Sequence, residues 1–278
     1  MARDIGGLGY ISIESSMHRL CGASKLLMVL FVSLAAMITY DTRFLSAIIV
    51  VSFVMFFMGR VPLRKLRFVL VLIALLMLMN NVLIFLFSPE EGVKIYGTRH
   101  EMTHLFLHYY LTKEQIFYQI NVTLKYFSIM PLALIFLNTT EPSEFASSLN
   151  KIGVSYKVGY SVALALRYIP DVKREFHEIS QAQQARGIDM SRKVKLGVRI
   201  KNTTTILFPL VFSSMDKIEN ITNAMELRSF GKNKKRTWYR ARPFAPADYL
   251  LIVVSALMIA VSLFLNYLNG GRFYNPFL

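Results

Sequence analysis

Several common features are absent from this sequence of 278 residues. It contains one cysteine, Cys21, which excludes an intrachain disulfide. It has no Walker A phosphate loop, so we do not expect this chain to bind ATP itself, and no glycine-rich dinucleotide loop. No segment shows a strand pattern, and no small-residue cleavage site follows a short apolar core, as in a signal peptide.

Acidic residues are also scarce, and the charge balance points to a membrane protein. There are 32 Lys and Arg against 17 Asp and Glu, which gives a formal net charge of +15. The composition is 54% hydrophobic and the mean hydropathy is +0.42. Together these values favour several membrane spans plus a basic soluble part. In such a protein the positive excess indicates cytoplasmic loops rather than a nucleic-acid partner.

Long apolar runs predict five membrane spans. About 20 apolar residues are needed to cross the bilayer core. Two spans form a hairpin over residues 20–61, broken at Asp41, Thr42 and Arg43, and three more cover residues 68–87, 116–137 and 249–268. We therefore predict an all-α integral membrane protein with about five transmembrane helices. A cytoplasmic insertion of long amphipathic helices completes this fold class.

The flanking charges predict the orientation. Residues 60–67 carry four basic and no acidic side chains and should be cytoplasmic, whereas residues 89–114 are mixed in charge and should lie outside. Residues 139–242 carry 19 Lys and Arg against 9 Asp and Glu and should be inside. The N-terminus is then cytoplasmic and the C-terminus outside. The predicted domains are residues 1–138 with four spans, 139–244 as a soluble insertion, and 245–278 with the last span.

The insertion is expected to contain three helices. A short one runs from Glu141 to Gly153. A second covers residues 155–186, in which Arg174 and Glu178 are expected to pair. It carries one apolar stripe: Val158, Val162, Leu166, Ile169, Val172, Phe176 and Ile179. The third covers about residues 191–230, so the two long helices should measure about 50 and 60 Å.

One motif has the form used by zinc proteases. His100, Glu101 and His104 form an H-E-x-x-H sequence, with His108 one turn further on. On a helix, two histidines four residues apart can bind zinc while the glutamate acts as general base. The motif lies in the predicted outer loop, however, and lacks the glycine of the metzincin pattern. Both observations disfavour a zinc site, so we expect no metal or other cofactor. A membrane metalloprotease that uses His100, Glu101 and His104 remains an alternative function.

A second alternative is a secondary transporter. Lys125 lies inside a predicted span, where a charge can mark an ion path. The simpler interpretation is that Lys125 contacts Asn80 or Asn81 within the helix bundle. Secondary transporters normally show inverted repeats and broken helices, and five spans with a central insertion do not divide into halves.

Both long helices are expected to end at an arginine. The first ends at Ala185-Arg186-Gly187, and the second at Leu227-Arg228-Ser229. A single arginine before a glycine commonly caps a helix and complements its dipole. Two such ends in one insertion suggest binding, because a guanidinium offers five donors that suit carboxylates in the groove of a partner.

These features together resemble the transmembrane T component of energy-coupling factor (ECF) transporters, which are ABC-type importers of vitamins and metal ions. The resemblance covers most of the chain. It rests on segments at residues 16–20 and 25–26, on Leu166-Arg167-Tyr168-Ile169-Pro170, Glu175 and residues 179–187, and on residues 224–231.

The resemblance implies a non-catalytic coupling subunit in the plasma membrane of a prokaryote. Two coupling helices would cross in an X, and their tips would dock in grooves of two ABC-type ATPase subunits. A membrane-embedded S component would bind the substrate. Arg186 and Arg228 would be the docking arginines. Leu227 and Ser229 replace the alanine and glycine usual in the second motif, so we expect Gly231 to end that helix two residues later.

Overall fold

The computed structural model describes residues 15–106, 109–188, 195–233, 237–239 and 241–277. The chain divides into two compact units. The first runs to Glu144 and resumes at Arg242, and the second is Phe145–Ala241. Each unit has its own internal contacts and is described separately.

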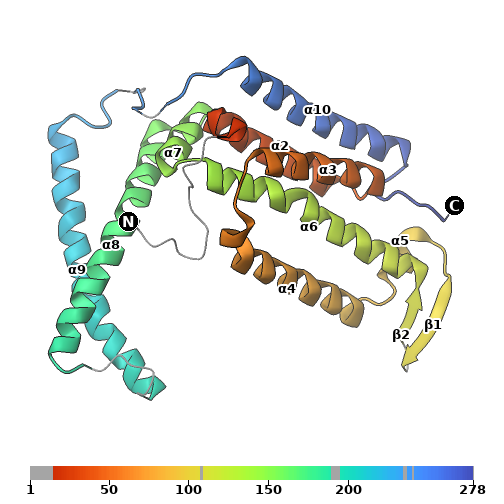
Figure 1. Ribbon diagram of the computed structural model, residues 1–278, viewed down its shortest axis with the longest axis horizontal. Coiled ribbons are helices and arrows are strands. Elements are labelled where there is room, and N and C mark those ends of the chain that lie inside the picture. The colour runs from red at the N-terminus through yellow and green to blue at the C-terminus, as the bar shows by residue number, and fades with distance from the viewer. Residues whose placement is uncertain (1–14, 107–108, 189–194, 234–236, 240, 278) are drawn as a thin grey trace. The chain divides into compact units, whose positions relative to one another are not determined.

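Five apolar helices build the first unit. They are α2 (Gly22–Ile38), α3 (Thr42–Met58), α4 (Leu63–Phe87), α6 (Lys113–Thr139) and α10 (Pro246–Leu268). Figure 1 shows α2, α3, α6 and α10 running alongside one another, and α2 packs on α6 and α10 while α3 packs on α6. Leu45, Ile48 and Ile135 are fully buried in this core. Two short helices, α1 (Ser16–Arg19) and α5 (Glu91–Tyr96), complete the helical part of the unit.

The five predicted spans are all present as apolar helices, but their lengths differ. Three of them, α4, α6 and α10, are long and apolar enough to cross a membrane. The hairpin predicted over residues 20–61 is present as α2 and α3, which are apolar but contain 17 residues each. At 1.5 Å per residue each measures about 25 Å, somewhat less than the bilayer core. Asp41 ends the turn between them by accepting a hydrogen bond from the Arg43 amide at 2.9 Å.

The expectation that the chain contains no strand is wrong. Strand β1 (Glu101–Phe106) pairs in antiparallel fashion with β2 (Tyr109–Thr112). Aromatic residues and threonine, which favour strands, are frequent in these two segments. Both segments are short and carry bulges between the paired residues, so they lack a run of regular alternation.

Three helices form the insertion, as predicted. α7 (Pro142–Lys151) begins in the first unit, and α8 (Tyr156–Ala185) and α9 (Leu196–Leu227) lie in the second. Ser155 caps α8 through the Val158 amide. With 30 and 32 residues, α8 and α9 measure about 45 and 48 Å. The difference from the expected length is larger for α9, because this helix begins at Leu196 and ends at Leu227. The predicted pair of Arg174 with Glu178 is wrong, since Arg174 pairs with Asp171 at 2.8 Å.

Candidate functional site

The two long helices of the second unit cross near their middles (Figure 1). At the crossing, the Glu175 carboxylate of α8 accepts hydrogen bonds from the Ser213 hydroxyl and from Lys217 Nζ of α9, the latter at 2.7 Å. The Lys217 ammonium and the Ser213 hydroxyl hold the pKa of Glu175 below its ordinary value. Nearer the end of α8, Gln183 Nε2 donates to the Thr205 carbonyl at 3.5 Å. These contacts fix one long helix against the other.

This crossing should make the second unit sensitive to acid. Because the folded state lowers the pKa of Glu175, its contribution to stability is complete at neutral pH and is lost as the pH falls through the lowered pKa. The Glu175→Gln variant should be less stable than wild type at pH 7 and should lose this part of the acid sensitivity. Thermal unfolding of both proteins across the acidic range measures it. The same dependence of the unfolding temperature on pH in both proteins would contradict the role of Glu175.

The first arginine tip is the C-terminus of α8. Arg186 is the C-cap residue, with φ −84° and ψ 7°, and Gly187 follows with φ 87°. The Gly187 amide donates to the Gln184 carbonyl at 3.0 Å, and the Ile188 amide donates to Gln183 at 3.1 Å. This is a Schellman motif, in which a left-handed residue turns the chain away and satisfies the last carbonyls.

The second tip, at the end of α9, closes in the same way. Arg228 is the C-cap residue, with φ −87° and ψ 13°, and Ser229 takes the left-handed position with φ 55°. The Ser229 amide donates to the Glu226 carbonyl at 2.8 Å, and the Phe230 amide donates to Met225 at 2.9 Å. The expectation that Gly231 ends this helix two residues later is therefore wrong.

Aromatic packing gives a physical reason for the left-handed serine. The Phe230 ring lies 4.8 Å from the Tyr160 ring and 5.7 Å from the Tyr156 ring, both at the start of α8. A non-glycine residue in the left-handed region costs roughly 1–2 kcal/mol. Packing of Phe230 and the two Schellman hydrogen bonds offset this cost. The turn must occur at Ser229 for Phe230 to reach α8.

Both tips present their arginines to solvent. Ala185, Arg186 and Gly187 are exposed, and so are Leu227, Arg228 and Ser229. Neither guanidinium forms a hydrogen bond or ion pair with another described residue. Leu227 is 88% exposed, so a large apolar side chain is accessible directly beside Arg228. The second tip therefore offers one cation beside one apolar side chain, whereas the first offers a cation beside small residues.

The H-E-x-x-H motif lies on the β-hairpin and not on a helix. His100 Nδ1 is 2.6 Å from Glu114 Oε1, and the same carboxylate accepts from the His100 amide and from Thr98. His104 is part of β1, and His108 lies outside the described residues. Within the residues that the structure describes, no group of three or more His, Cys, Asp or Glu side chains could hold a metal ion. The helical arrangement that a zinc protease requires is not formed by this motif.

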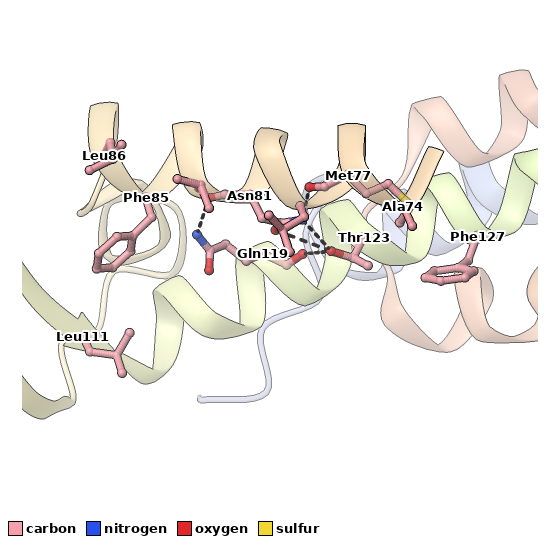
Figure 2. Close-up of a pocket in the computed structure, with 11 residues that line it drawn as sticks. Ala74, Met77, Asn81, Phe85, Leu86, Leu111, Gln119, Thr123 and Phe127 are labelled. Atoms are coloured by element: carbon pink, nitrogen blue, oxygen red, sulfur yellow. Dashed lines mark hydrogen bonds between the residues drawn. The ribbon is translucent and has the colours of Figure 1, made fainter. Parts of the chain in front are cut away.

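Lys125 does not contact Asn80 or Asn81, contrary to expectation. Its ammonium donates to the Met37 carbonyl at 3.2 Å and lies 3.2 Å from the centre of the Tyr40 ring. Asn81 instead turns toward α6, where its Nδ2 donates to Thr123 Oγ1 at 3.1 Å (Figure 2). Lys125 thus meets the turn between α2 and α3, where an aromatic ring and a free carbonyl accept its charge.

A groove of about 690 Å³ lies between α4 and α6 beside this asparagine. Apolar side chains of both helices line it, and Gln119 Nε2 donates to the Asn81 carbonyl at 3.1 Å across its floor (Figure 2). Few residues of α4 are buried, namely Leu66, Val69 and Met77. The polar contacts of Asn81 are therefore a large part of what holds α4 to α6.

Replacing Asn81 with leucine should loosen α4. A hydrogen bond between membrane helices contributes about 1 kcal/mol, and Asn81→Leu removes the side-chain bond to Thr123. Reversible unfolding in mixed micelles measures the difference. Asn80→Leu is a matched control, because the buried Asn80 Oδ1 has no hydrogen-bond partner among the described residues. Equal destabilisation by the two variants would contradict this role of Asn81.

The family of the chain follows from its similarity to known proteins. A family model described as cobalt transport protein, CbiQ, matches residues 14–239, a range that covers most of the chain and includes both tips. The chain belongs to the CbiQ family. It is similar to the energy-coupling factor transporter transmembrane protein EcfT of Thermotoga maritima, with 28% identity over 278 residues and 95% of each chain covered. The EcfT protein of Bacillus selenitireducens is 25% identical over 273 residues, covering 94% of this chain and 97% of the relative.

Another relative connects the CbiQ family to ABC proteins by name. A putative ABC transporter ATP-binding protein of Bifidobacterium longum is 26% identical over 209 residues, which is 72% of this chain and 25% of that protein. Membership in the CbiQ family and the apolar helices identify a multi-pass membrane transport protein, the T component of an ECF-type transporter. The relatives named EcfT are described as transmembrane proteins of energy-coupling factor transporters.

Within this CbiQ-family chain, the two tips should respond oppositely to exchange of the left-handed residue. Ser229→Gly removes the cost of a side chain at positive φ and should stabilise the end of α9 by about 1 kcal/mol. Gly187→Ala adds that cost without any steric contact, since nothing lies within 4 Å of an added Cβ, and should destabilise α8 by a similar amount. Hydrogen exchange of the last-turn amides measures both. Shifts of the same sign would contradict the shared geometry.

Proposed function

We propose that this chain is the non-catalytic coupling subunit of an ECF-type importer. It transmits ATP-driven motion of two ABC-type ATPase subunits to a membrane-embedded S component, for uptake of a vitamin or a metal ion. ATP hydrolysis belongs to the partner ATPases. The observation that carries the proposal is the pair of exposed arginine tips with matching backbone geometry. The name of the Bifidobacterium longum relative supports a connection to ATP-binding subunits.

Each tip docks into a groove of one ATPase. Arg186 and Arg228 have no partner within the part of the chain that the structure describes, so each guanidinium keeps its five donors for carboxylates of the ATPase. The matching caps give both arginines the same backbone setting. The side chains beside them differ, because Leu227 occupies the place of Ala185. A groove that accepts Leu227 needs a larger apolar pocket, which suits two non-identical ATPase subunits.

Rigid helices suit this task. A helix of about 45 Å moves as a lever, whereas a loop would absorb the displacement. The contacts of Glu175 hold α8 to α9 at their crossing, so the two tips move as parts of one body. Exposed apolar side chains remain on both helices for the S component, including Ile169, Val172, Phe208, Phe212 and Met215. In this proposal residues 139–244 form the coupling domain, between membrane parts at 1–138 and 245–278.

The proposed orientation places the coupling domain in the cytoplasm of a prokaryotic cell. Positive residues accumulate on the cytoplasmic side of membrane proteins. Arg60, Arg64, Lys65 and Arg67 lie between the apolar stretches of α3 and α4, and the coupling domain is strongly basic. The N-terminus is then cytoplasmic and the C-terminus outside, with the protein in the plasma membrane.

Photo-crosslinking tests the proposal directly. A benzophenone amino acid is placed at Ala185 or at Leu227, beside the two arginines, in the protein made by its own host. Each position should crosslink to an ATP-binding subunit. Tyr239, which is 99% exposed and lies apart from the helix ends in sequence, is the control position. The proposal fails if no ATP-binding protein is captured from either tip.

A further inference from the structure

The turn that follows the second tip lies against two polar side chains at the start of α8. Gly231 comes three residues after Arg228 and has a φ of 93°. A Cβ added at Gly231 would lie 3.7 Å from Lys157 Nζ and 4.0 Å from the Tyr156 hydroxyl oxygen. Both polar groups therefore approach the same point beside this turn. All four residues belong to the second unit.

The Tyr156 hydroxyl is a buried polar group without a hydrogen bond. Tyr156 is 6% exposed, and its hydroxyl finds no hydrogen-bond partner among the described residues. Such groups are unfavourable and rare in native proteins. The Tyr156 ring packs on Phe230 at 5.7 Å, and a phenylalanine ring could make the same contact. Packing of the second unit therefore does not account for the hydroxyl.

Cations without a partner come together at this turn. Lys157, Arg228 and Lys232 are exposed, and none of their side chains forms a hydrogen bond or ion pair with another described residue. Glu226, in the last turn of α9, pairs with none of them. The Cα atoms of Arg228 and Gly231 lie at most about 11 Å apart, because three residues separate them. Since like charges repel one another, this surface favours a partner of negative charge.

The first tip does not repeat this pattern in sequence. Counting from each arginine, Gly231 corresponds to Asp189, which lies outside the described residues. The chain therefore continues into an acid after Arg186, but into a glycine and Lys232 after Arg228. An acidic group of a partner would be attracted after the second tip and opposed by a like charge after the first.

We propose that Lys157 and the Tyr156 hydroxyl form a second docking contact beside Arg228, which receives a carboxylate of the ATPase subunit held by this tip. The inference rests on the proposed coupling function. The flexible stem of Lys157 lets its ammonium move outward and uncover the hydroxyl. The carboxylate then accepts one hydrogen bond from the ammonium and one from the hydroxyl, which gains the partner that it lacks in the chain alone.

Photo-crosslinking from the two tips tests this contact. The full-length chain is made in its own host with a benzophenone amino acid at Leu227 or, in a second preparation, at Ala185. The assembly is bound through a tag on this chain, washed with salt for a fixed time and irradiated. Mass spectrometry then identifies the adducts that are ATP-binding subunits. Salt weakens exposed charge contacts, so the yield reports how firmly each tip holds its ATPase.

The variants should act on the second tip alone. Lys157→Glu should lower the yield from Leu227 about tenfold, and Tyr156→Phe should lower it about threefold. The yield from Ala185 should change by less than about twofold in both variants, because the first tip does not use this contact.

Two matched controls lie on the same helix. Lys173→Glu makes the same charge change at an exposed lysine of α8 that is sixteen residues from Lys157. Tyr160→Phe removes the hydroxyl of the other tyrosine that packs on Phe230. Both controls should leave the yields from both tips at the wild-type level.

Thermal unfolding separates docking from folding. Because the Tyr156 hydroxyl has no partner among the described residues, Tyr156→Phe should not lower the unfolding temperature of the purified chain. A lower unfolding temperature would show that the hydroxyl stabilises the fold, and would overturn its assignment to the partner.

The crosslinking outcomes also distinguish this contact from the proposed function. A wild-type yield from Leu227 in Lys157→Glu would overturn the contact. An equal fall at both tips would overturn it as well, because the effect would not be specific to the second tip. If the wild-type chain gives no adduct with an ATP-binding subunit from either position, the proposed coupling function itself is contradicted.

Discussion

Replacing both Arg186 and Arg228 with alanine should release the ATPase subunits and leave the membrane protein folded. Neither guanidinium has a partner among the described residues, so the fold loses no contact. Truncating one partner of a buried charge pair at an interface commonly costs at least 2 kcal/mol. Two such losses amount to about 4 kcal/mol, or roughly a thousandfold weaker association. Quantitative co-purification of ATPases with the tagged chain measures the loss.

Arg174→Ala is the matched control for this experiment. Arg174 also lies on α8, its side chain is 69% exposed, and it pairs with Asp171 on its own helix. Its removal takes away the same charge without touching a tip, so the ATPases should remain bound. The single variants should each lose less than the double variant, because one docking contact remains. Retention of the ATPases by the double variant would show that the arginines do not dock them.

The second large effect is expected from Gly159→Leu. A Cβ at Gly159 would lie 3.0 Å from the Ala146 carbonyl oxygen and 3.2 Å from the Trp238 ring. Overpacking of this kind costs about 1–3 kcal/mol. The leucine should separate α8 from α7 and displace Trp238, whose Nε1 donates to Asn150 at 3.1 Å. Since Trp238 is the only tryptophan, its emission reports the displacement directly.

Thermal unfolding and the emission maximum measure this effect together. The expected result is a lower unfolding temperature with red-shifted emission. Gly197→Ala is the control, because nothing lies within 4 Å of a Cβ at that helical position and its φ is not in the left-handed region. That variant should be neutral or slightly stabilising. Unchanged emission in Gly159→Leu would contradict the packing of Trp238 on α8.

Apolar runs and helical periodicity were sufficient to predict the long helices and to place an arginine at the end of α8 and of α9, but not the short helices α1 and α5. The positions of α8 and α9 follow from apolar residues spaced at three and four positions, and this local signal needs no knowledge of the fold. The end of α9 did not follow, because glycine is the expected left-handed residue and Ser229 takes that conformation instead. The decisive contact is made by Phe230 with Tyr156 and Tyr160, which lie 74 and 70 residues earlier in the sequence.

Other features also depended on distant contacts. Lys125 was expected beside two asparagines of the neighbouring α4, but it lies over Tyr40, at the turn between α2 and α3. The start of α2 is capped by the carboxylates of Glu144 and Asp248, which lie far away in the sequence, and only the three-dimensional arrangement reveals these contacts. Glu144 could be read from the sequence only as an acidic residue near a helix start, and Asp248 as the residue before an apolar run.

Native mass spectrometry of the assembly purified through a tag on this chain tests the central claim most directly. The claim is that two tips of one chain each hold an ATPase subunit. We predict one copy of this chain with two ATPase subunits and one small membrane-embedded S component. In the Arg186→Ala and Arg228→Ala double variant, the ATPases should be absent from the spectrum. A wild-type chain that carries no ATPase, or a single one, would contradict the account.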